Sequence, residues 1–91
     1  MERRLNAVFE ALAHPVRRRV LTLLGDGPLS AGDIAGHFDL TKPTLSSHFA
    51  KLREAGLVTV DRQGTSLIYH LNLSVLEQAL AGLLSLGDKK H

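Results

Sequence analysis

The amino-acid sequence predicts a mainly α-helical fold with one small β-hairpin, in the order helix, helix, a pair of helices joined by a tight turn, hairpin, helix. Apolar residues recur at spacings of three and four along most of the 91 residues, as they do on amphipathic helices. Capping residues or a proline precede four of these segments. Only between residues 57 and 71 is the sequence rich in the β-branched and aromatic residues of strands. We therefore expect about five helices plus a two-stranded hairpin.

The first two helices meet at Pro15. The first has four apolar residues at helical spacing: Leu5, Val8, Phe9 and Leu12. It cannot continue through His14, because a residue that precedes proline is disfavoured in the α region. Pro15 itself suits the first position of the second helix, and the stretch 25–28, which contains two glycines and a proline, ends that helix.

Two short helices follow, and the sequence marks the start of each. Ser30 with Asp33 three residues later forms a capping box, and Thr41 can cap the next helix. Only residues 36–39 separate the two, which is too short for anything but a tight turn. The second of the pair ends at Gly56, because glycine suits the left-handed conformation that follows many helices. The sequence therefore predicts a helix-turn-helix.

Beyond this pair we expect a hairpin and a last helix. Residues 57–61 and 66–71 have the composition of strands, and the polar stretch 62–65 joins them. Ser74 with Glu77 forms a further capping box, so the last helix should open there.

Composition limits the classes of protein to which the chain can belong. Apolar residues make up 44% and charged residues 22% of the sequence, which is a globular balance. There is no cysteine, which excludes disulfides, thiolate metal sites and a cysteine nucleophile. No apolar run approaches the ~20 residues of a membrane span, and the N-terminal residues do not resemble a secretion signal. We expect a single domain over residues 1–91, cytoplasmic and not inserted in a membrane.

We assign the function to the second helix of the helix-turn-helix, within residues 41–55. On a helical wheel its side chains Leu45, Phe49 and Leu52 share a narrow arc and must face the core. The other side chains are small, hydroxyl-bearing or basic: Pro43, Thr44, Ser47, Ala50 and Lys51 lie opposite the core, and Lys42, Ser46 and His48 flank them. Such a face can enter the major groove of DNA and approach the base edges. The alternative, a merely solvated face, usually carries Glu together with Lys.

Five motifs along the chain carry a family resemblance: LAHPVRRRVL at 12–21, SAGDIA at 30–35, TKPTLSSHFAKL at 41–52, EAGLV at 54–58 and RQG at 62–64. Together they resemble the ArsR/SmtB family of bacterial winged helix-turn-helix repressors, from about residue 8 to residue 86. The resemblance implies that the recognition helix contacts DNA through Lys42, Thr44, Ser46, Ser47 and His48. It also implies that the hairpin is a wing, and that its tip contacts the DNA backbone or minor groove through Arg62, Gln63 and Thr65.

Basic residues surround the predicted interface. Three of them cluster around the recognition helix and the wing, where they would add affinity that depends on salt and not on base sequence: Lys51, Arg53 and Arg62. Three more spread around the second helix: Arg17, Arg18 and Arg19. Their residue types leave two roles open, phosphate contacts or ion pairs with Asp26, Asp33 or Glu54.

The sequence departs from the metal sensors of this family. Those proteins use a Cys-x-Cys motif near the helix before the turn, or Asp and His ligands on the last helix. Here residues 31–35 include no thiol, and Glu77 is the only ionisable residue between 73 and 87. The five histidines lie on separate predicted elements without metal-ligand spacing: His14 at a cap or packed turn, His48 on the recognition helix, His70 on a wing strand, and His37 and His91 on the surface. The chain thus resembles the autorepressor-like (SdpR-like) subgroup, and we expect neither a metal nor another cofactor.

Two helices carry more apolar surface than packing within one subunit needs. In the last helix the apolar arc spans about 180°, wider than the ~100° stripe of an ordinary surface helix. Large exposed apolar patches mark interfaces, so we expect a homodimer in which the first and last helices pair about a two-fold axis. The interface residues would be Leu5, Val8, Phe9, Leu12, Leu76, Leu80, Leu83 and Leu84. The alternative is that both stripes pack within one subunit.

The function that follows is a DNA-binding transcriptional repressor, a homodimer on a pseudo-palindromic operator, that does not respond to metals. An unidentified effector, an anti-repressor protein, or autoregulation by concentration alone would control its release. The rival hypothesis is a winged helix that docks onto proteins without specific DNA binding, but the recognition face lacks an apolar or acidic patch. We do not expect an enzyme, because Ser46, Ser47 and His48 are consecutive on one helix and their side chains diverge.

Overall fold

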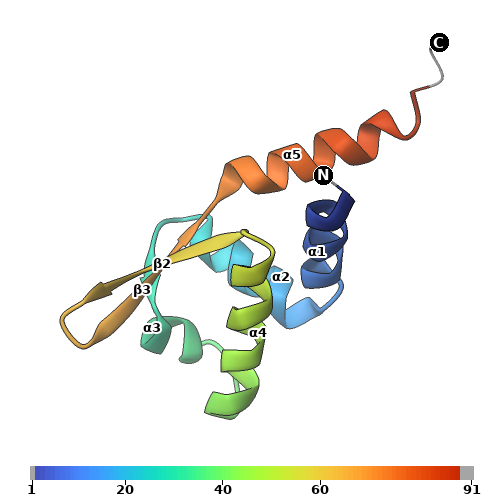
Figure 1. Ribbon diagram of the computed structural model, residues 1–91. Helices are drawn as coiled ribbons and strands as arrows, with labels where there is room; N and C mark the ends of the chain where they lie inside the picture. The colour runs from blue at the N-terminus through green and yellow to red at the C-terminus, as the bar shows by residue number, and fades with distance from the viewer. Residues whose placement is uncertain (1, 89–91) are drawn as a thin grey trace.

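The computed structural model describes residues 2–88, which form five α-helices and three β-strands (Figure 1). In chain order the elements are α1 (Glu2–Leu12), α2 (Pro15–Leu24), β1 (Leu29–Ser30), α3 (Ala31–Ala35), α4 (Lys42–Glu54), β2 (Val58–Gln63), β3 (Ser66–Leu71) and α5 (Leu73–Ser85). The predicted fold class is confirmed, with the addition of the short strand β1. None of the helices in this part of the chain is long and apolar enough to cross a membrane.

Side-chain caps start three of the helices, and the sequence predicts those of α3 and α4. His14 is the N-cap of α2, where its Nδ1 accepts a hydrogen bond from a backbone N–H of the first turn (3.1 Å). Ser30 Oγ accepts from the Asp33 N–H at the start of α3 (3.0 Å), and Thr41 Oγ1 accepts from the Thr44 N–H at the start of α4 (3.4 Å). Each cap satisfies a backbone donor that has no partner within its helix.

Gly56 ends α4 in the left-handed conformation that the sequence predicts (φ 77°). The Gly56 N–H donates to the Arg53 carbonyl oxygen (2.9 Å), and the Leu57 N–H donates to that of Leu52 (3.0 Å). These two bonds form a Schellman motif, and Leu57 is fully buried behind it. The chain therefore reverses at Gly56 and enters β2 against the helix that it has just left.

The sheet is antiparallel, and β3 is its central strand in the order β1-β3-β2. Only Gly64 and Thr65 join β2 to β3, so the predicted four-residue connection is wrong, and Arg62 and Gln63 belong to β2. Gly64 has a positive φ (62°), as the first loop residue of a type II′ turn does. β1 has no signature in the sequence, because two residues are too few to show the alternation of a strand.

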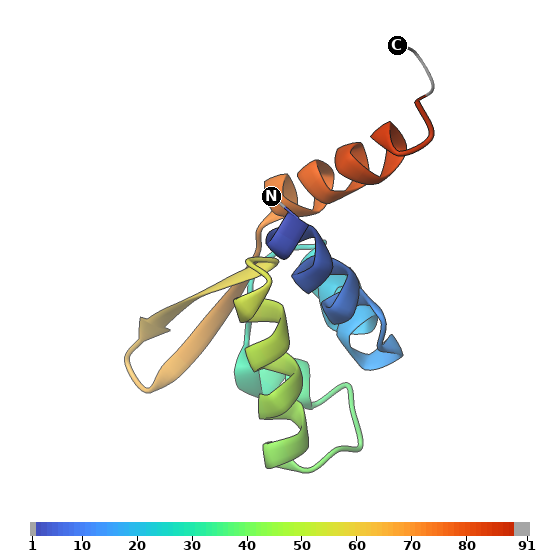
Figure 2. The same ribbon diagram turned by 45° about the vertical axis from the view of Figure 1, so that its right-hand side comes forward.

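The core lies on two sides of α4. On one side Leu45, Phe49 and Leu52 are buried as predicted, and the Phe49 ring stacks on Tyr69 of β3 with 4.5 Å between centroids. On the other side α1 and α2 pack against α4 (Figures 1 and 2). The exposed strip of α4 is therefore narrower than the exposed strip of a helix that buries a single apolar stripe.

The predicted start of the last helix at Ser74 is wrong. α5 begins at Leu73, and its N-cap, Asn72, makes no side-chain capping bond to the helix. Ser74 Oγ instead donates to Asn72 Oδ1 (3.0 Å). The Asn72 N–H donates to the Leu57 carbonyl oxygen (2.8 Å), and this bond ties the chain to the start of the hairpin. The helix therefore begins directly after β3 and not at the capping box.

α5 extends away from the core, beside α1 and at the opposite end of the molecule from the first residues of α4 (Figures 1 and 2). The radius of gyration, 14.4 Å, exceeds the ~12 Å of a compact chain of this length. Val75 and Ala79 are buried, but four leucines of α5 and the one that follows the helix are exposed: Leu73, Leu80, Leu83, Leu84 and Leu86. Val8 is fully buried in the core of its own chain, so its predicted place in a dimer interface is wrong.

Candidate nucleic-acid interface

The N-terminal half of α4 projects from the body of the molecule (Figures 1 and 2). Four side chains that the sequence assigns to DNA contact are exposed there: Lys42, Thr44, Ser46 and Ser47. Pro43, in the first turn, and Ala50, farther along the helix, are exposed as well. This face has short hydroxyl side chains, one cation and no carboxylate between residues 42 and 50. It therefore allows the helix backbone to approach the floor of a groove.

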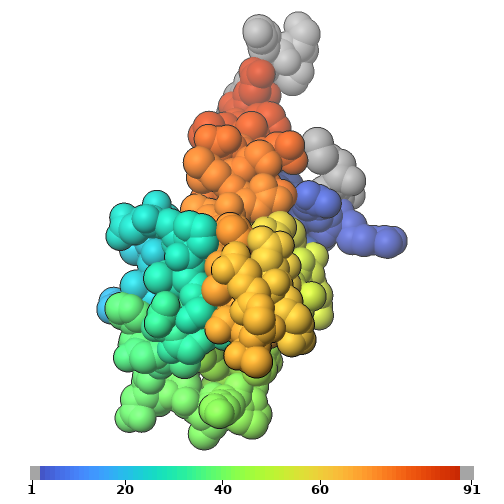
Figure 3. Space-filling view, turned by 90° about the vertical axis from the view of Figure 1, so that its left-hand side faces the viewer, coloured from blue at the N-terminus to red at the C-terminus, as the bar shows by residue number. Residues whose placement is uncertain are grey.

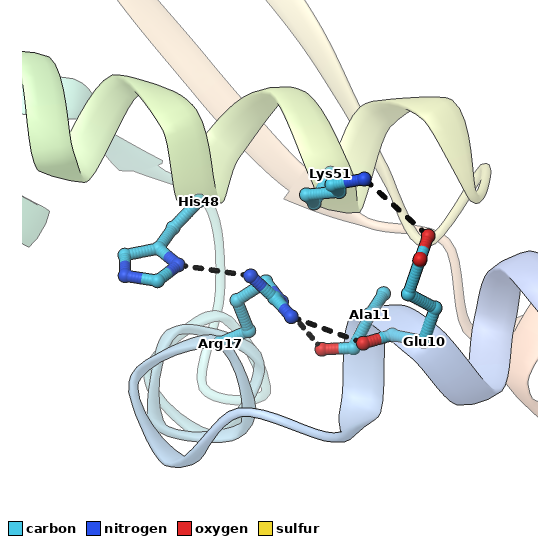
Figure 4. Close-up of polar contacts among 5 residues, drawn as sticks. All are labelled: Glu10, Ala11, Arg17, His48 and Lys51. Carbon is cyan, nitrogen blue, oxygen red and sulfur yellow. Dashed lines mark hydrogen bonds and ion pairs between the residues drawn. The ribbon is translucent and has the colours of Figure 1, made fainter.

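His48 does not belong to this exposed face, and the prediction that it does is wrong. Its side chain is only 8% exposed. His48 Nδ1 lies 3.1 Å from Arg17 Nη1 (Figure 4), and the ring centroid lies 4.4 Å from that of His14. Burial, with the neighbouring His14 and Arg17, lowers the pKa of His48. The helical wheel misplaced His48 because it counted only apolar side chains as core. In the structure the partly buried Arg17 gives this polar side chain of α4 a partner inside the fold.

Lys51 lies on the same side of α4, one turn after His48. Its Nζ lies 3.4 Å from Glu10 Oε1 of α1, and Figure 4 shows the two side chains reaching toward each other. Lys51 is thus directed toward α1, but its side chain is still 43% exposed, and its contact with DNA stays a prediction. Both side chains of this pair remain partly in solvent, so it contributes at most about 1 kcal/mol of stability. It still directs the Lys51 ammonium toward α1.

Arg17 and Arg18 bind backbone carbonyls of α1 and not the carboxylates considered from the sequence. Arg17 Nε donates to the Ala11 oxygen (2.8 Å), and Nη2 donates to that of Glu10 (3.0 Å). Arg18 Nη1 donates to the Leu12 oxygen (2.6 Å). The carbonyls at the end of a helix lack N–H partners within it, so α2 caps α1. No periodicity or motif in the sequence indicates these contacts, because a turn separates each donor from its acceptor.

The wing places Arg62 and Gln63 on opposite faces of the hairpin. Residues directly opposite each other on paired strands share a face, and successive residues alternate. Arg62 lies opposite Leu67, two residues before Tyr69, whose ring packs on α4. Arg62 and Leu67 therefore face the α4 side, whereas Gln63 faces away. Thr65 lies in the turn, and the side chains at this tip are exposed.

The other charged groups of the hairpin lie on the face turned away from α4. Asp61 Oδ2 lies 2.9 Å from His70 Nε2 across the two strands, and both alternate with the residues that face α4. Arg62 is thus the charged side chain of the hairpin on the α4 side. Figure 3 shows the molecule from the side of the wing: the hairpin lies in front, and residues near the start of α4, in green, lie below it.

The histidines do not form a metal site in the described part of the chain. His14 caps α2, His48 contacts Arg17, and His70 pairs with Asp61. Within residues 2–88 no three His, Asp, Glu or Cys side chains are grouped so that they could hold a metal ion. His91 lies outside the described residues.

Proteins of known function share this sequence pattern. A family model described as a helix-turn-helix domain matches residues 12–61. The transcriptional repressor SdpR of Bacillus subtilis (strain 168) is 39% identical over 85 residues, which cover 93% of this chain and 94% of that protein. The arsenical resistance operon repressor of Staphylococcus xylosus is 37% identical over 73 residues, which cover 80% of this chain and 70% of that protein.

A solved structure shares the fold as well. The crystal structure of an ArsR family transcriptional regulator matches with a TM-score of 0.82 and 29% sequence identity, and the match covers 100% of this chain and 97% of the other. Sequence and architecture thus agree over the recognition helix, the wing and the terminal helices. The chain belongs to the ArsR/SmtB family of winged helix-turn-helix transcriptional regulators.

Proposed function

We propose that the protein is a transcriptional repressor that binds a pseudo-palindromic operator in double-stranded DNA as a homodimer. The observation that carries this proposal is the exposed polar face at the start of α4. The same helix packs against the wing through the Phe49 and Tyr69 rings, and Arg62 lies on the face of the wing that is turned toward α4. A helix with short polar side chains fits the major groove, and its N-terminus favours a nearby phosphate. Two relatives are named as repressors, which supports the same role.

Within this interface α4 reads base edges and the wing contacts the DNA backbone. The base-reading side chains are those with hydroxyl groups: Thr44, Ser46 and Ser47. The residues that hold phosphates or sugars are Lys42, Arg62, Gln63 and Thr65. His48 is not assigned to DNA, because its ring is buried and its Nδ1 lies against Arg17. Lys51 stays assigned to a phosphate, because its exposed ammonium has three N–H donors and Glu10 uses one of them.

The dimer forms through α1 and α5. Leu73, Leu80 and Leu84 recur at spacings of seven and four, so they share one exposed face of α5. Five more of the predicted residues keep surface for a partner: Leu83 is exposed, and Leu5, Phe9, Leu12 and Leu76 are half-buried. A groove between α1 and α5, lined in part by Leu5, Val75 and Gly82, suits a leucine side chain from a second copy. Pairing there leaves both α4 helices free, and their separation should match one DNA turn, about 34–36 Å.

Operator binding in this proposal is not controlled by metal ions. A tight site needs three or four convergent donors, the sequence has no cysteine, and His14, His48 and His70 are engaged with other groups. Release then comes from an effector molecule, from a protein that competes for the α4 face, or from autoregulation by concentration alone.

Selection of bound duplexes from a random pool tests the proposal. We expect an enriched site with two inverted half-sites about 10 base pairs apart, and an affinity that falls as salt is raised. Added zinc, nickel, cadmium or arsenite should leave the affinity unchanged, whereas a cell extract that contains the effector or competitor should reduce it. A pool without enrichment would contradict the repressor function, and an asymmetric single site would contradict the dimer.

A further inference from the structure

Arg17 connects the end of α1 to the middle of α4 through one guanidinium group (Figure 4). Nε and Nη2 donate to the carbonyl oxygens of Ala11 and Glu10, at 2.8 and 3.0 Å, while Nη1 lies 3.1 Å from His48 Nδ1. The donors of a guanidinium lie in one rigid plane. These three contacts therefore fix where His48 lies relative to α1, and the proposed DNA interface uses none of them.

The contact with Arg17 requires a neutral His48. A guanidinium only donates hydrogen bonds, so His48 Nδ1 accepts and the ring proton is on Nε2. A second proton would turn Nδ1 into a donor that faces another donor, and would place a positive charge beside Arg17. The other ionisable groups around this junction are His14 before α2, Glu10 of α1 and Lys51 of α4. The last two are paired with each other (3.4 Å).

The surroundings of the His48 ring favour this neutral form. The side chain is buried, and the His14 ring packs at 4.4 Å between centroids. Burial lowers the pKa of His48, and the charges of His14 and Arg17 lower it further. The hydrogen bond and the surroundings of the ring thus select the same protonation state.

We propose that Arg17 and His48 are positioning residues for DNA recognition: the neutral His48 ring, held by Arg17, sets the orientation of α4, and protonation of His48 weakens specific binding. His48 directly follows Ser47 in α4, so a shift of the helix at His48 moves the hydroxyl side chains assigned to base edges. This inference rests on the proposed operator binding by α4, and it adds a dependence on pH to that function.

The first test compares the unmodified protein with His48→Gln at about pH 7.5 and about pH 5.0; the lower value lies well below the ordinary histidine pKa of about 6.5, because the pKa of His48 is lowered. Glutamine offers Arg17 an acceptor oxygen but does not titrate. For each protein the ratio of operator affinities at the two pH values is measured at one salt concentration, with circular dichroism to verify that both are folded. We expect the unmodified protein to lose more affinity on acidification, by up to about tenfold per pH unit, the limit for one proton. On random DNA the two proteins should show the same ratio of affinities between the two pH values.

A histidine NMR titration supplies a second readout. If protonation weakens operator binding, then bound operator must lower the pKa of His48, because the two equilibria are linked. A raised pKa in the complex would indicate a direct contact with phosphate and would overturn the inference. Equal pH ratios for both proteins would also overturn it, while leaving the repressor function intact. Failure to select any operator would overturn the proposed function, and this inference with it.

Arg17→Lys tests the other half of the contact. Lysine keeps the charge but cannot hold two carbonyls and a ring nitrogen in one plane. Operator affinity should fall severalfold at neutral pH, and the pH ratio should approach that of His48→Gln. Arg19→Lys, at an exposed position of the same helix, is the matched control and should keep both values. An Arg17→Lys protein with unchanged affinity and an unchanged pH ratio would contradict a positioning role.

Discussion

Ser47 lies on the exposed face of α4, and its side chain is short enough for the helix to approach a base edge. Ser47→Glu places a longer, negatively charged side chain there. We expect operator affinity, measured by fluorescence anisotropy, to fall by about five- to 150-fold, which corresponds to the ~1–3 kcal/mol of a base contact. The free energy of unfolding should change by no more than about 0.5 kcal/mol, because the position is exposed. Ser74→Glu, exposed on α5, is the charge-matched control. If the two variants bound equally well, α4 would not be the reading helix.

His48 makes the stability of the fold depend on pH. Its pKa in the folded chain is lowered from 6.5, so between the lowered value and pH 6.5 the unfolded chain binds more protons than the folded one. The stabilisation by the neutral ring is therefore fully present above pH 6.5, and it is lost as the pH falls through the lowered pKa. Urea unfolding at several pH values should show a steeper loss below pH 6.5 for the unmodified protein than for His48→Gln. Parallel curves would contradict this expectation.

At the scale of elements, the junction between α4 and β2 depends on Gly56. Its φ of 77° costs a residue with a Cβ about 1–2 kcal/mol. A Cβ at this position would meet its nearest neighbour at 3.6 Å, so no clash adds to that cost. Gly56→Ala should therefore lower the free energy of unfolding by about 1–2 kcal/mol in urea titrations. Gly32→Ala, inside α3, should be neutral or stabilising. A Gly56→Ala protein as stable as Gly32→Ala would show that the left-handed residue is not under strain.

The wing predicts different roles for two neighbouring residues. Arg62→Ala should weaken binding to operator and to random DNA alike, and should reduce the slope of log affinity against log salt by about 0.9, the value for one phosphate contact. Gln63→Ala, on the opposite face of the hairpin and uncharged, should leave the slope unchanged. A changed sequence preference of Arg62→Ala at constant slope would mean that Arg62 reads bases.

At the scale of the whole molecule, the exposed side of α5 decides whether the protein is a dimer. Leu84 is 77% exposed and Leu80 50%. Arginine at either position should yield a monomer in sedimentation and abolish specific operator binding, because a single half-site contact remains. Ser85→Arg adds the same charge at an exposed position on the polar side of the same helix, and should leave the dimer intact. A stable monomer of the unmodified protein at micromolar concentration would contradict both the dimer and the palindromic operator.

Local sequence patterns predicted the helices, most of their boundaries and the helix that we assign to DNA recognition. The caps at Ser30 and Thr41 and the reversal at Gly56 are local, because each needs partners only a few residues away. Apolar periodicity likewise identified the buried side of α4, with Leu45 and Phe49. The exposed candidates at the start of α4 followed from the same pattern.

Tertiary structure alone decided which polar side chains of α4 remain free. His48 contacts Arg17, which is 31 residues away in the sequence, and Lys51 contacts Glu10, which is 41 residues away. No local pattern therefore indicates that the His48 and Lys51 side chains have these partners. The start of α5 was displaced in the same way, by a hydrogen bond from Asn72 to the distant hairpin. Periodicity and capping act over one or two turns of chain, whereas these contacts exist only once α1, α2, α4 and the sheet have packed together.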